Sequence, residues 1–390
     1  MRKEILTTSV IASAASLEGA MITVAVPQIA SQLHISMIDS TAFLTLYALI
    51  SSLLFVPFYL IAERKGVKKL LFLGSLVFSS AGIAILFINS FLPALVLRSL
   101  QAVGSSMIYP AQLAYATSFK GDEGKNLGFN YSMLALAYIL GAVLGYFIGL
   151  ADWRLLFLLP SVIVLASLFF MPGLKELRGN FGSPRSVIGP TLVFNGALLS
   201  PYSFYVGLPL FLAGLYSLMR WPLKREFLKP LFSGFFHSIS RYVVVEYLVL
   251  SYAGLFQADP LYALLLIILF PAPMLLLSAP LGRALGDRDK AFAIAGFSLM
   301  LLSWLFPFNK VLATIVLGIG TAIGTVSNTA YTMKNLRVEE RVVGSAIKTL
   351  EGVVGISLGP AIAVALFHFG FGVELAIFVL NLLAILLLIL

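Results

Sequence analysis

The chain has 390 residues, of which 60% are hydrophobic and 11% are charged, and its mean hydropathy is +1.00. This composition excludes a soluble globular protein and points to a protein dissolved in a bilayer. A net charge of +9 is compatible with a nucleic-acid surface, but the positions of the basic residues, described below, exclude that interpretation. The chain contains no cysteine. The missing thiols exclude disulfides and thiolate metal sites.

Apolar segments long enough to cross a hydrocarbon core of about 30 Å recur along the whole chain. Six are predicted at about 5–27, 40–62, 68–89, 91–118, 127–150 and 154–172. An ambiguous apolar block follows at 187–219, and six more spans are predicted at about 231–254, 260–281, 291–307, 310–333, 342–368 and 371–390. No stretch remains for a soluble domain.

Almost all Lys and Arg residues fall in alternate gaps between these segments, beginning with Arg2 and Lys3. The opposite gaps hold only Arg154 and Lys310. By the positive-inside rule the basic gaps are cytoplasmic, so we expect a multi-pass protein of the cell membrane with a cytoplasmic N-terminus. The charge orients the chain in the bilayer, and we expect no nucleic-acid partner.

The same rule constrains the ambiguous block, because basic clusters flank it at 175–185 and 220–229. With both ends on one side, the block must cross the bilayer an even number of times. It forms either two short helices that turn near Ser200, Pro201 and Tyr202 or a re-entrant hairpin. We favour two crossings, fourteen in total.

A faint internal copy accompanies this arrangement. Glu63, Arg64 and Gly66 follow the second span, and Gly286, Asp287 and Arg288 follow the second of the last six. Both are charged turns between comparable helices, as expected for two related bundles. We therefore predict an all-α membrane protein with a six-helix bundle at 1–178, an inserted transmembrane hairpin with cytoplasmic linkers at 179–228, and a second six-helix bundle at 229–390.

Several stretches resemble signatures of the major facilitator superfamily, and within it of the fourteen-helix drug:proton antiporters. Residues 17–29 (LEGAMITVAVPQI) are similar to the first-helix signature, 57–69 (PFYLIAERKGVKK) to the motif between helices two and three, and 98–104 (RSLQAVG) to the fourth-helix motif. Gly141 and Gly145 retain two glycines of the fifth-helix antiporter motif, although Ala142 replaces its Pro and Tyr146 its last Gly. Asp152-Trp153-Arg154 resembles the junction typical of the fourteen-helix members.

The resemblance implies two bundles that rock about a central site, with Gly141 and Gly145 providing close helix contacts. It also implies a cytoplasmic gate at the two charged turns, formed by the residues Glu63, Arg64, Gly66, Asp287 and Arg288. In that gate Glu63 meets a helix N-terminus of the other bundle in the outward-open state. The alternative is that these turns are merely solvated and set the topology.

Ionisable residues inside spans mark candidate functional positions, because such a group costs several kcal/mol unless it has a partner or water. Glu18 lies about 20 Å along the first helix, near the midplane, and is a candidate proton carrier. The resemblance of the fourth-helix motif implies a coupling role for Arg98, in which it holds Glu18 or another acid deprotonated until substrate or a proton arrives. The alternatives are a protonated Glu18 bonded to a neighbouring helix and an Arg98 that only packs.

The second half contains four further ionisable residues inside spans, two on each of two helices. Arg241 and Glu246 are five residues apart and point about 140° away from each other around one helix, so each needs another partner or an aqueous cavity. We assign both, with Glu18 and Arg98, to proton coupling. Lys348 and Glu351 are three apart and are predicted to form a buried ion pair.

The candidate substrate cavity includes one residue of the first-helix signature, one of the fourth-helix motif and three tyrosines able to stack on an organic cation. These residues are Met21, Gln101, Tyr109, Tyr131 and Tyr242. The predicted function is a proton-coupled antiporter that exports amphipathic organic compounds by alternating access. Its expected partners are a small-molecule substrate, protons and the lipid bilayer, and we expect a monomer.

Two alternatives stay open within and outside this class. The same fold would serve an exporter or importer of a specific metabolite such as a sugar, an amino acid or an organic ion. A membrane-embedded enzyme would need a catalytic motif, and none of the common zinc, serine-hydrolase or phosphate-loop patterns occurs. We expect no cofactor and no metal, since His34, His237 and His368 lie far apart in the sequence.

Overall fold

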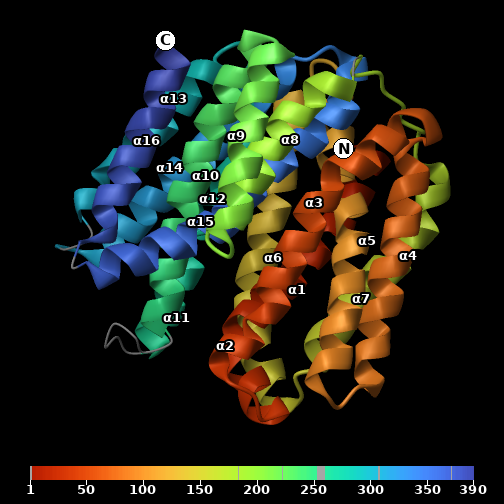
Figure 1. Ribbon diagram of the computed structural model, residues 1–390, viewed down its shortest axis with the longest axis vertical. Helices are drawn as coiled ribbons and strands as arrows, with labels where there is room; N and C mark the ends of the chain where they lie inside the picture. Colours follow the sequence, from red (N-terminus) through yellow and green to blue (C-terminus); the bar gives the residue numbers. More distant parts are fainter. Residues whose placement is uncertain (1, 183, 222, 253–259, 306–307, 370) are drawn as a thin grey trace.

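A computed structural model describes residues 2–182, 184–221, 223–252, 260–305, 308–369 and 371–390. In this part of the chain the regular structure is entirely helical (Figure 1). Nine helical segments of the described residues are long and apolar enough to cross a bilayer, and α9 and α16 are shorter apolar helices. The chain is a multi-pass membrane protein.

The first half of the chain forms one bundle, coloured red to yellow in Figure 1. Helix α1 lies at its centre and packs against α5, α6 and α7, while α3 and α4 pack against α5. The bundle comprises α1 (Lys3–Leu33), the short α2 (Met37–Ser40), α3 (Ala42–Lys65), α4 (Val67–Ala84), α5 (Phe91–Thr117), α6 (Glu123–Ala151) and α7 (Leu155–Ser167).

The second half forms a matching bundle around α10, which packs against α14, α15 and α16. It comprises α10 (Arg225–Tyr252), α11 (Pro260–Leu269), α12 (Ala272–Ala284), α13 (Asp289–Met300), α14 (Lys310–Lys334), α15 (Arg341–His368) and α16 (Val373–Ile389). The predicted span at 260–281 is divided between α11 and α12 by a turn at Phe270 and Pro271. The last two residues of the span predicted at 291–307 lie outside the described residues.

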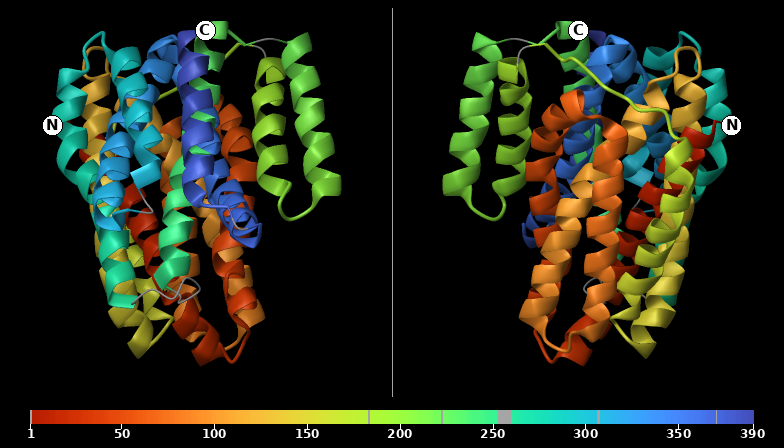
Figure 2. Two further views of the ribbon diagram at one scale, coloured as in Figure 1. Left: turned by 90° about the vertical axis from the view of Figure 1, so that its left-hand side faces the viewer. Right: turned by 90° about the vertical axis from the view of Figure 1, so that its right-hand side faces the viewer.

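Between the bundles, α8 (Pro184–Leu199) and α9 (Phe204–Arg220) pack against each other as a hairpin at one side of the molecule (Figure 2). The chain turns at residues 200–203. At a rise of about 1.5 Å per residue these helices are about 24 and 26 Å long, similar to α16 and somewhat short for a core of about 30 Å. That they form an inserted transmembrane hairpin stays a prediction.

The helix contacts within the first bundle depend on small side chains. A Cβ on Gly141 would lie 2.7 Å from the carbonyl oxygen of Leu17, and one on Gly145 would lie 2.5 Å from that of Met21. Glycine allows α6 to approach the backbone of α1 this closely. These two residues therefore hold α6 on α1 within one bundle and do not form the contact between bundles.

At the opposite end from the chain termini, the junction of α6 and α7 is held by Asp152 and Arg154. The Arg154 Nε and Nη2 atoms donate to the two carboxylate oxygens of Asp152, both at 2.9 Å. This bidentate pairing holds the pKa of Asp152 below its usual range. Between them, Trp153 is buried against Phe43 and Phe157, so this junction closes the apolar end of the first bundle.

Candidate functional site

A cavity of about 780 Å³ lies between the two bundles. Its walls come from α1, α3, α5 and α6 of the first bundle, from α10, α11, α12, α14 and α15 of the second, and from the hairpin turn. This volume lies in the range of sites for drug-sized organic molecules. The two bundles thus share one central site.

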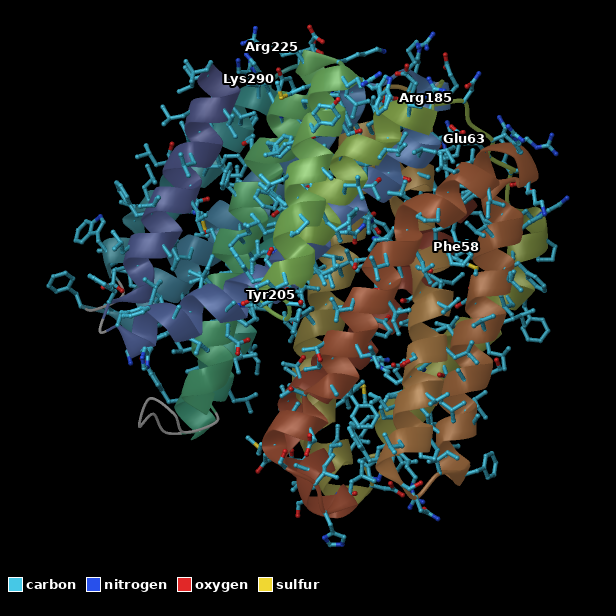
Figure 3. All side chains as sticks on the ribbon, in the orientation of Figure 1. Phe58, Glu63, Arg185, Tyr205, Arg225 and Lys290 are labelled. Atoms are coloured by element: carbon cyan, nitrogen blue, oxygen red, sulfur yellow. The ribbon has the colours of Figure 1, made fainter. Side chains whose placement is uncertain are left out.

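The lining of the cavity stops short of one end of the molecule, which we call the basic end. Arg185, Arg225 and Lys290 lie at this end (Figure 3), and the N and C labels lie toward it (Figure 1). On α6 the lining begins at Asn130, seven residues after the helix starts, and on α15 it begins at Lys348. From these positions the lining continues toward the opposite end, as far as Thr41 on α3 and Val364 on α15. The cavity therefore extends away from the basic end.

Glu18 and Arg98 form a fully buried ion pair beside this cavity. Arg98 Nη1 donates to Glu18 Oε1, and Gln101 Nε2 donates to Glu18 Oε2 at 3.2 Å. Both carboxylate oxygens therefore have a partner, which is what makes a charge tolerable at this depth. The pairing joins α1 to α5 through two residues that the sequence assigned to proton coupling.

The rest of the Arg98 side chain is also held in place. Its Nε atom donates to the carbonyl oxygen of Phe43 at 3.0 Å, and the ring of Tyr47 lies 3.8 Å from its guanidinium carbon. Arg98 and Tyr47 both line the cavity, whereas Glu18 does not. A change in the cavity therefore reaches Glu18 through Arg98.

Two residues assigned to the substrate cavity from the sequence lie elsewhere. Met21 is fully buried on the face of α1 that packs against Gly145, so it contributes to helix packing. Gln101 is fully buried, and its amide contacts Glu18 and Arg98. Gln101 thus supports the ion pair and does not line the cavity.

The three tyrosines of the predicted site, Tyr109, Tyr131 and Tyr242, do line the cavity. The Tyr131 hydroxyl forms a hydrogen bond of 3.0 Å with that of Thr329 on α14, and so links the two bundles. Tyr242 carries the guanidinium of Arg241 over its ring, with a distance of 4.8 Å to the centroid.

The second bundle contributes two kinds of charged group to the cavity. Lys348 Nζ and Glu351 Oε2 lie 2.5 Å apart as a buried pair, the local contact that their spacing allows. Arg241 and Glu246 also line the cavity, and among the described residues neither forms an ion pair. These two are therefore the charges most available to a bound molecule.

Closure of the basic end rests on an ion pair that the sequence did not indicate. Arg341 on α15 donates to Glu123 Oε1 on α6 at 3.0 Å and also to the carbonyl oxygen of Thr117 at the end of α5. Both charged side chains are more than nine-tenths buried. Because α6 and α15 belong to different bundles, this contact must break if the basic end opens.

Next to this pair, α6 and α12 touch through glycine. A Cβ on Gly128 would lie 2.1 Å from the carbonyl oxygen of Ser278, and one on Gly282 would lie 2.1 Å from that of Gly124. The spacing of Gly124 and Gly128 is a small-residue motif, which is the one sequence signal that points to this contact. These glycines, and not Gly141 and Gly145, form the close contact between the bundles.

The predicted gate residues occupy the basic end but contact other groups than expected. Glu63 accepts a hydrogen bond from the backbone N–H of Phe181, in the linker before α8, and not from a helix N-terminus of the second bundle. Gly66 adopts φ +99°, the left-handed region that glycine tolerates, and Arg64 is exposed.

In the corresponding turn of the second bundle, Asp287 and Arg288 are both exposed. The buried acid there is Asp289, which pairs with Lys334 of α14 at 2.5 Å within the same bundle. The ion pair between the bundles at this end is formed instead by Glu123 and Arg341.

Two related helical bundles around a shared central cavity are the architecture of secondary transporters. The sequence profile described as Major Facilitator Superfamily matches residues 8–223, and the chain belongs to this family. None of the curated proteins compared with the chain matches it.

Solved structures show the same fold over the whole chain. One is the crystal structure of the human organic anion transporter MFSD10 (TETRAN), with a TM-score of 0.74 and 12% identity, covering 100% of this chain and 98% of that one. Another is the proton:xylose symporter XylE bound to 6-bromo-6-deoxy-D-glucose, with a TM-score of 0.69 and 12% identity, covering 99% and 94%. At this identity the likeness concerns the fold alone.

Proposed function

We propose that this transporter is a proton-coupled antiporter that exports amphipathic organic compounds, and that it works as a monomer in the cell membrane with its N-terminus in the cytoplasm. The observation that carries the proposal is the buried pair of Glu18 and Arg98 at the wall of a cavity large enough for an organic molecule. A carboxylate held by one arginine and one amide is a group that can exchange a proton when its partner is drawn away.

The coupling follows from the order of the contacts. Arg98 faces both the cavity and Glu18, so a molecule that changes the position or environment of Arg98 weakens its hold on the carboxylate. Glu18 then takes up a proton. Release of that proton restores the pair, and the two states of the pair bias the two arrangements of the bundles.

If the basic end is cytoplasmic, the structure corresponds to an outward-facing state. Its cavity is closed where Glu123 meets Arg341 and extends toward the other side. Export then requires that this pair separates to admit substrate from the cytoplasm. The predicted gate residues Glu63, Arg64, Gly66, Asp287 and Arg288 belong to the same end and would move with it.

The proton role is tested by Glu18→Gln in proteoliposomes with an imposed pH gradient. Gln keeps the size of the side chain and a hydrogen-bond acceptor for Arg98 but cannot carry a proton at physiological pH. We expect gradient-driven transport of a fluorescent amphipathic dye to fall at least tenfold, while exchange of dye without a gradient persists. Glu4→Gln, in the first turn of the same helix, is the matched control and should behave like wild type.

Transport that still follows the pH gradient in Glu18→Gln would refute the proton role of this residue. Loss of both gradient-driven transport and dye exchange, with loss of a monodisperse elution peak, would indicate misfolding. In that case Glu18→Asp, which keeps the titratable group, must restore coupling for the proposal to stand.

The topology has its own test, helped by the absence of native cysteine. We expect Ser203→Cys, in the hairpin turn, to react with a membrane-impermeant maleimide added outside intact cells. Arg225→Cys, at the start of α10, should react only after permeabilisation. The reverse pattern would show that the basic end is outside, and labelling of both positions from the same side would show that the two crossings of the hairpin are wrong.

Arg241 supports one other substrate class. It lines the cavity and forms no ion pair among the described residues, so it offers a guanidinium to a carboxylate or another anionic group. Transport of a specific organic anion is therefore the second candidate. Arg241→Gln would abolish uptake of an anionic substrate and leave export of cationic dyes nearly unchanged.

A further inference from the structure

The hairpin turn is part of the cavity wall. Pro201 and Tyr202 line the cavity, although they lie outside both six-helix bundles. Helix α8 packs against α15 of the second bundle and α3 of the first, and so covers a seam between them (Figure 2). The hairpin therefore reaches the central site from the side.

The turn is held firmly in this position. A Cβ on Gly196 would lie 2.4 Å from the backbone nitrogen of Phe211, and one on Gly214 would lie 2.5 Å from that of Val193, so α8 and α9 are in backbone contact. The Ser357 hydroxyl of α15 donates to the carbonyl oxygen of Leu198 at 2.6 Å. A tightly packed hairpin fastened to α15 can place a side chain reproducibly.

Tyr202 is the side chain so placed. It is 48% exposed and lies beside Ser357, within electrostatic range of the Glu246 carboxyl. Tyr138 of α6 also lines the cavity and is likewise within range of Glu246. Two tyrosines from different parts of the fold thus line the same cavity as Glu246.

Glu246 has no cation of its own among the described residues. Arg241, five positions earlier on the same helix, turns its guanidinium over the ring of Tyr242. Lys348, which lines the same cavity, is already paired with Glu351 at 2.5 Å. A carboxylate in a cavity that tyrosine rings also line suits an organic cation, because the charge and the π faces both attract it.

We propose that Glu246, Tyr138 and Tyr202 form a subsite for the cationic group of an organic substrate, with the inserted hairpin supplying Tyr202. The assignment rests on the proposed function, since it specifies what the central cavity binds. It gives the hairpin a direct part in recognition, beyond joining the two bundles.

The test uses a pair of probes with the same shape and opposite charge, tetraphenylphosphonium and tetraphenylborate, bound to purified protein in nanodiscs and measured by isothermal titration calorimetry. We expect wild type to bind the cation and to bind the anion at least tenfold more weakly. Glu246→Gln should weaken cation binding about tenfold to a hundredfold. Tyr202→Ala should weaken it about threefold to thirtyfold, the range of a cation–π contact.

Two variants separate the ring of Tyr202 from the fold of the hairpin. Tyr202→Phe keeps the ring and should retain affinity within about twofold. Tyr205→Ala removes a 90% exposed tyrosine three residues away that does not line the cavity, and it should bind like wild type. Equal affinity of Tyr202→Ala and Tyr205→Ala for tetraphenylphosphonium would show that the hairpin is not part of the subsite.

The outcome is separable from that of the proton test. Cation binding that depends on Glu246 and Tyr202, in a protein whose transport ignores the pH gradient, would refute proton coupling and keep the subsite. Preferred binding of tetraphenylborate, unaffected by Glu246→Gln, would overturn the subsite and favour the organic-anion function.

Discussion

Replacing Arg98 by Met should destabilise the transporter by about 3–5 kcal/mol and abolish coupled transport, because the fully buried Glu18 carboxylate loses the guanidinium that pairs with it. Met fills a similar volume and avoids a large cavity, so the loss reports chiefly the unpaired charge. Thermal unfolding of the purified protein in detergent, followed by tryptophan fluorescence, measures the change.

Two further variants identify the cause of this loss. The double variant Glu18→Gln with Arg98→Met removes both charges and should recover most of the stability, yet remain uncoupled. Arg241→Met removes an arginine from the same cavity that has no ion pair among the described residues, and it should cost less than about 1 kcal/mol. Similar losses in Arg98→Met and Arg241→Met would mean that the pairing contributes little.

The pairing of Glu18 with Arg98 shows what a membrane sequence can predict about its site. The cost of a charge inside a span identifies each residue as one that needs a partner, and there are few candidates in the first half. The spans themselves follow from segment length and hydropathy for the same reason, since the bilayer tolerates few alternatives. The turn of the block at 187–219 agrees with the one observed at 200–203.

Contacts at the basic end are a different case. Glu123 and Arg341 stand among many charged residues that face water, so nothing in the sequence distinguishes a buried pair from solvated neighbours. The partner of Glu63 is a backbone amide in a linker, and no sequence pattern predicts which amide will be free. Burial at this end depends on how the two bundles dock.

The cavity wall was predicted only in part for a related reason. Aromatic residues form 13% of the chain, so composition cannot tell a tyrosine in the cavity from one that faces lipid. Met21 occupies a signature position, yet the signature serves the packing of α1 on α6. The hairpin turn lines the cavity because α8 packs against α3 and α15. This packing is a property of the assembled fold and cannot be read from the sequence.

Replacing Gly128 by Val should open the basic end and reduce transport at least tenfold. The new Cβ would lie 2.1 Å from the carbonyl oxygen of Ser278, and backbone cannot yield there unless α6 moves away from α12. Overpacking of this kind costs about 1–3 kcal/mol, enough to shift a two-state population about fivefold to a hundredfold. Val has a higher helix propensity than Gly, so the change acts through contact and not through α6 itself.

Spin labels at Lys125→Cys on α6 and Arg283→Cys on α12, both exposed, measure the opening by pulsed electron resonance. We expect a longer distance in Gly128→Val than in the parent. Ala151→Val, at the exposed last residue of α6, adds a branched side chain without a contact and should leave the distance unchanged. If Gly128→Val also left it unchanged, closure of the basic end would not depend on this contact. Arg341→Gln, which breaks the pair with Glu123, serves as the comparison. If both variants lengthened the distance equally, neither the glycine contact nor the ion pair alone would hold α6 against the second bundle. The two contacts would then act as one closure.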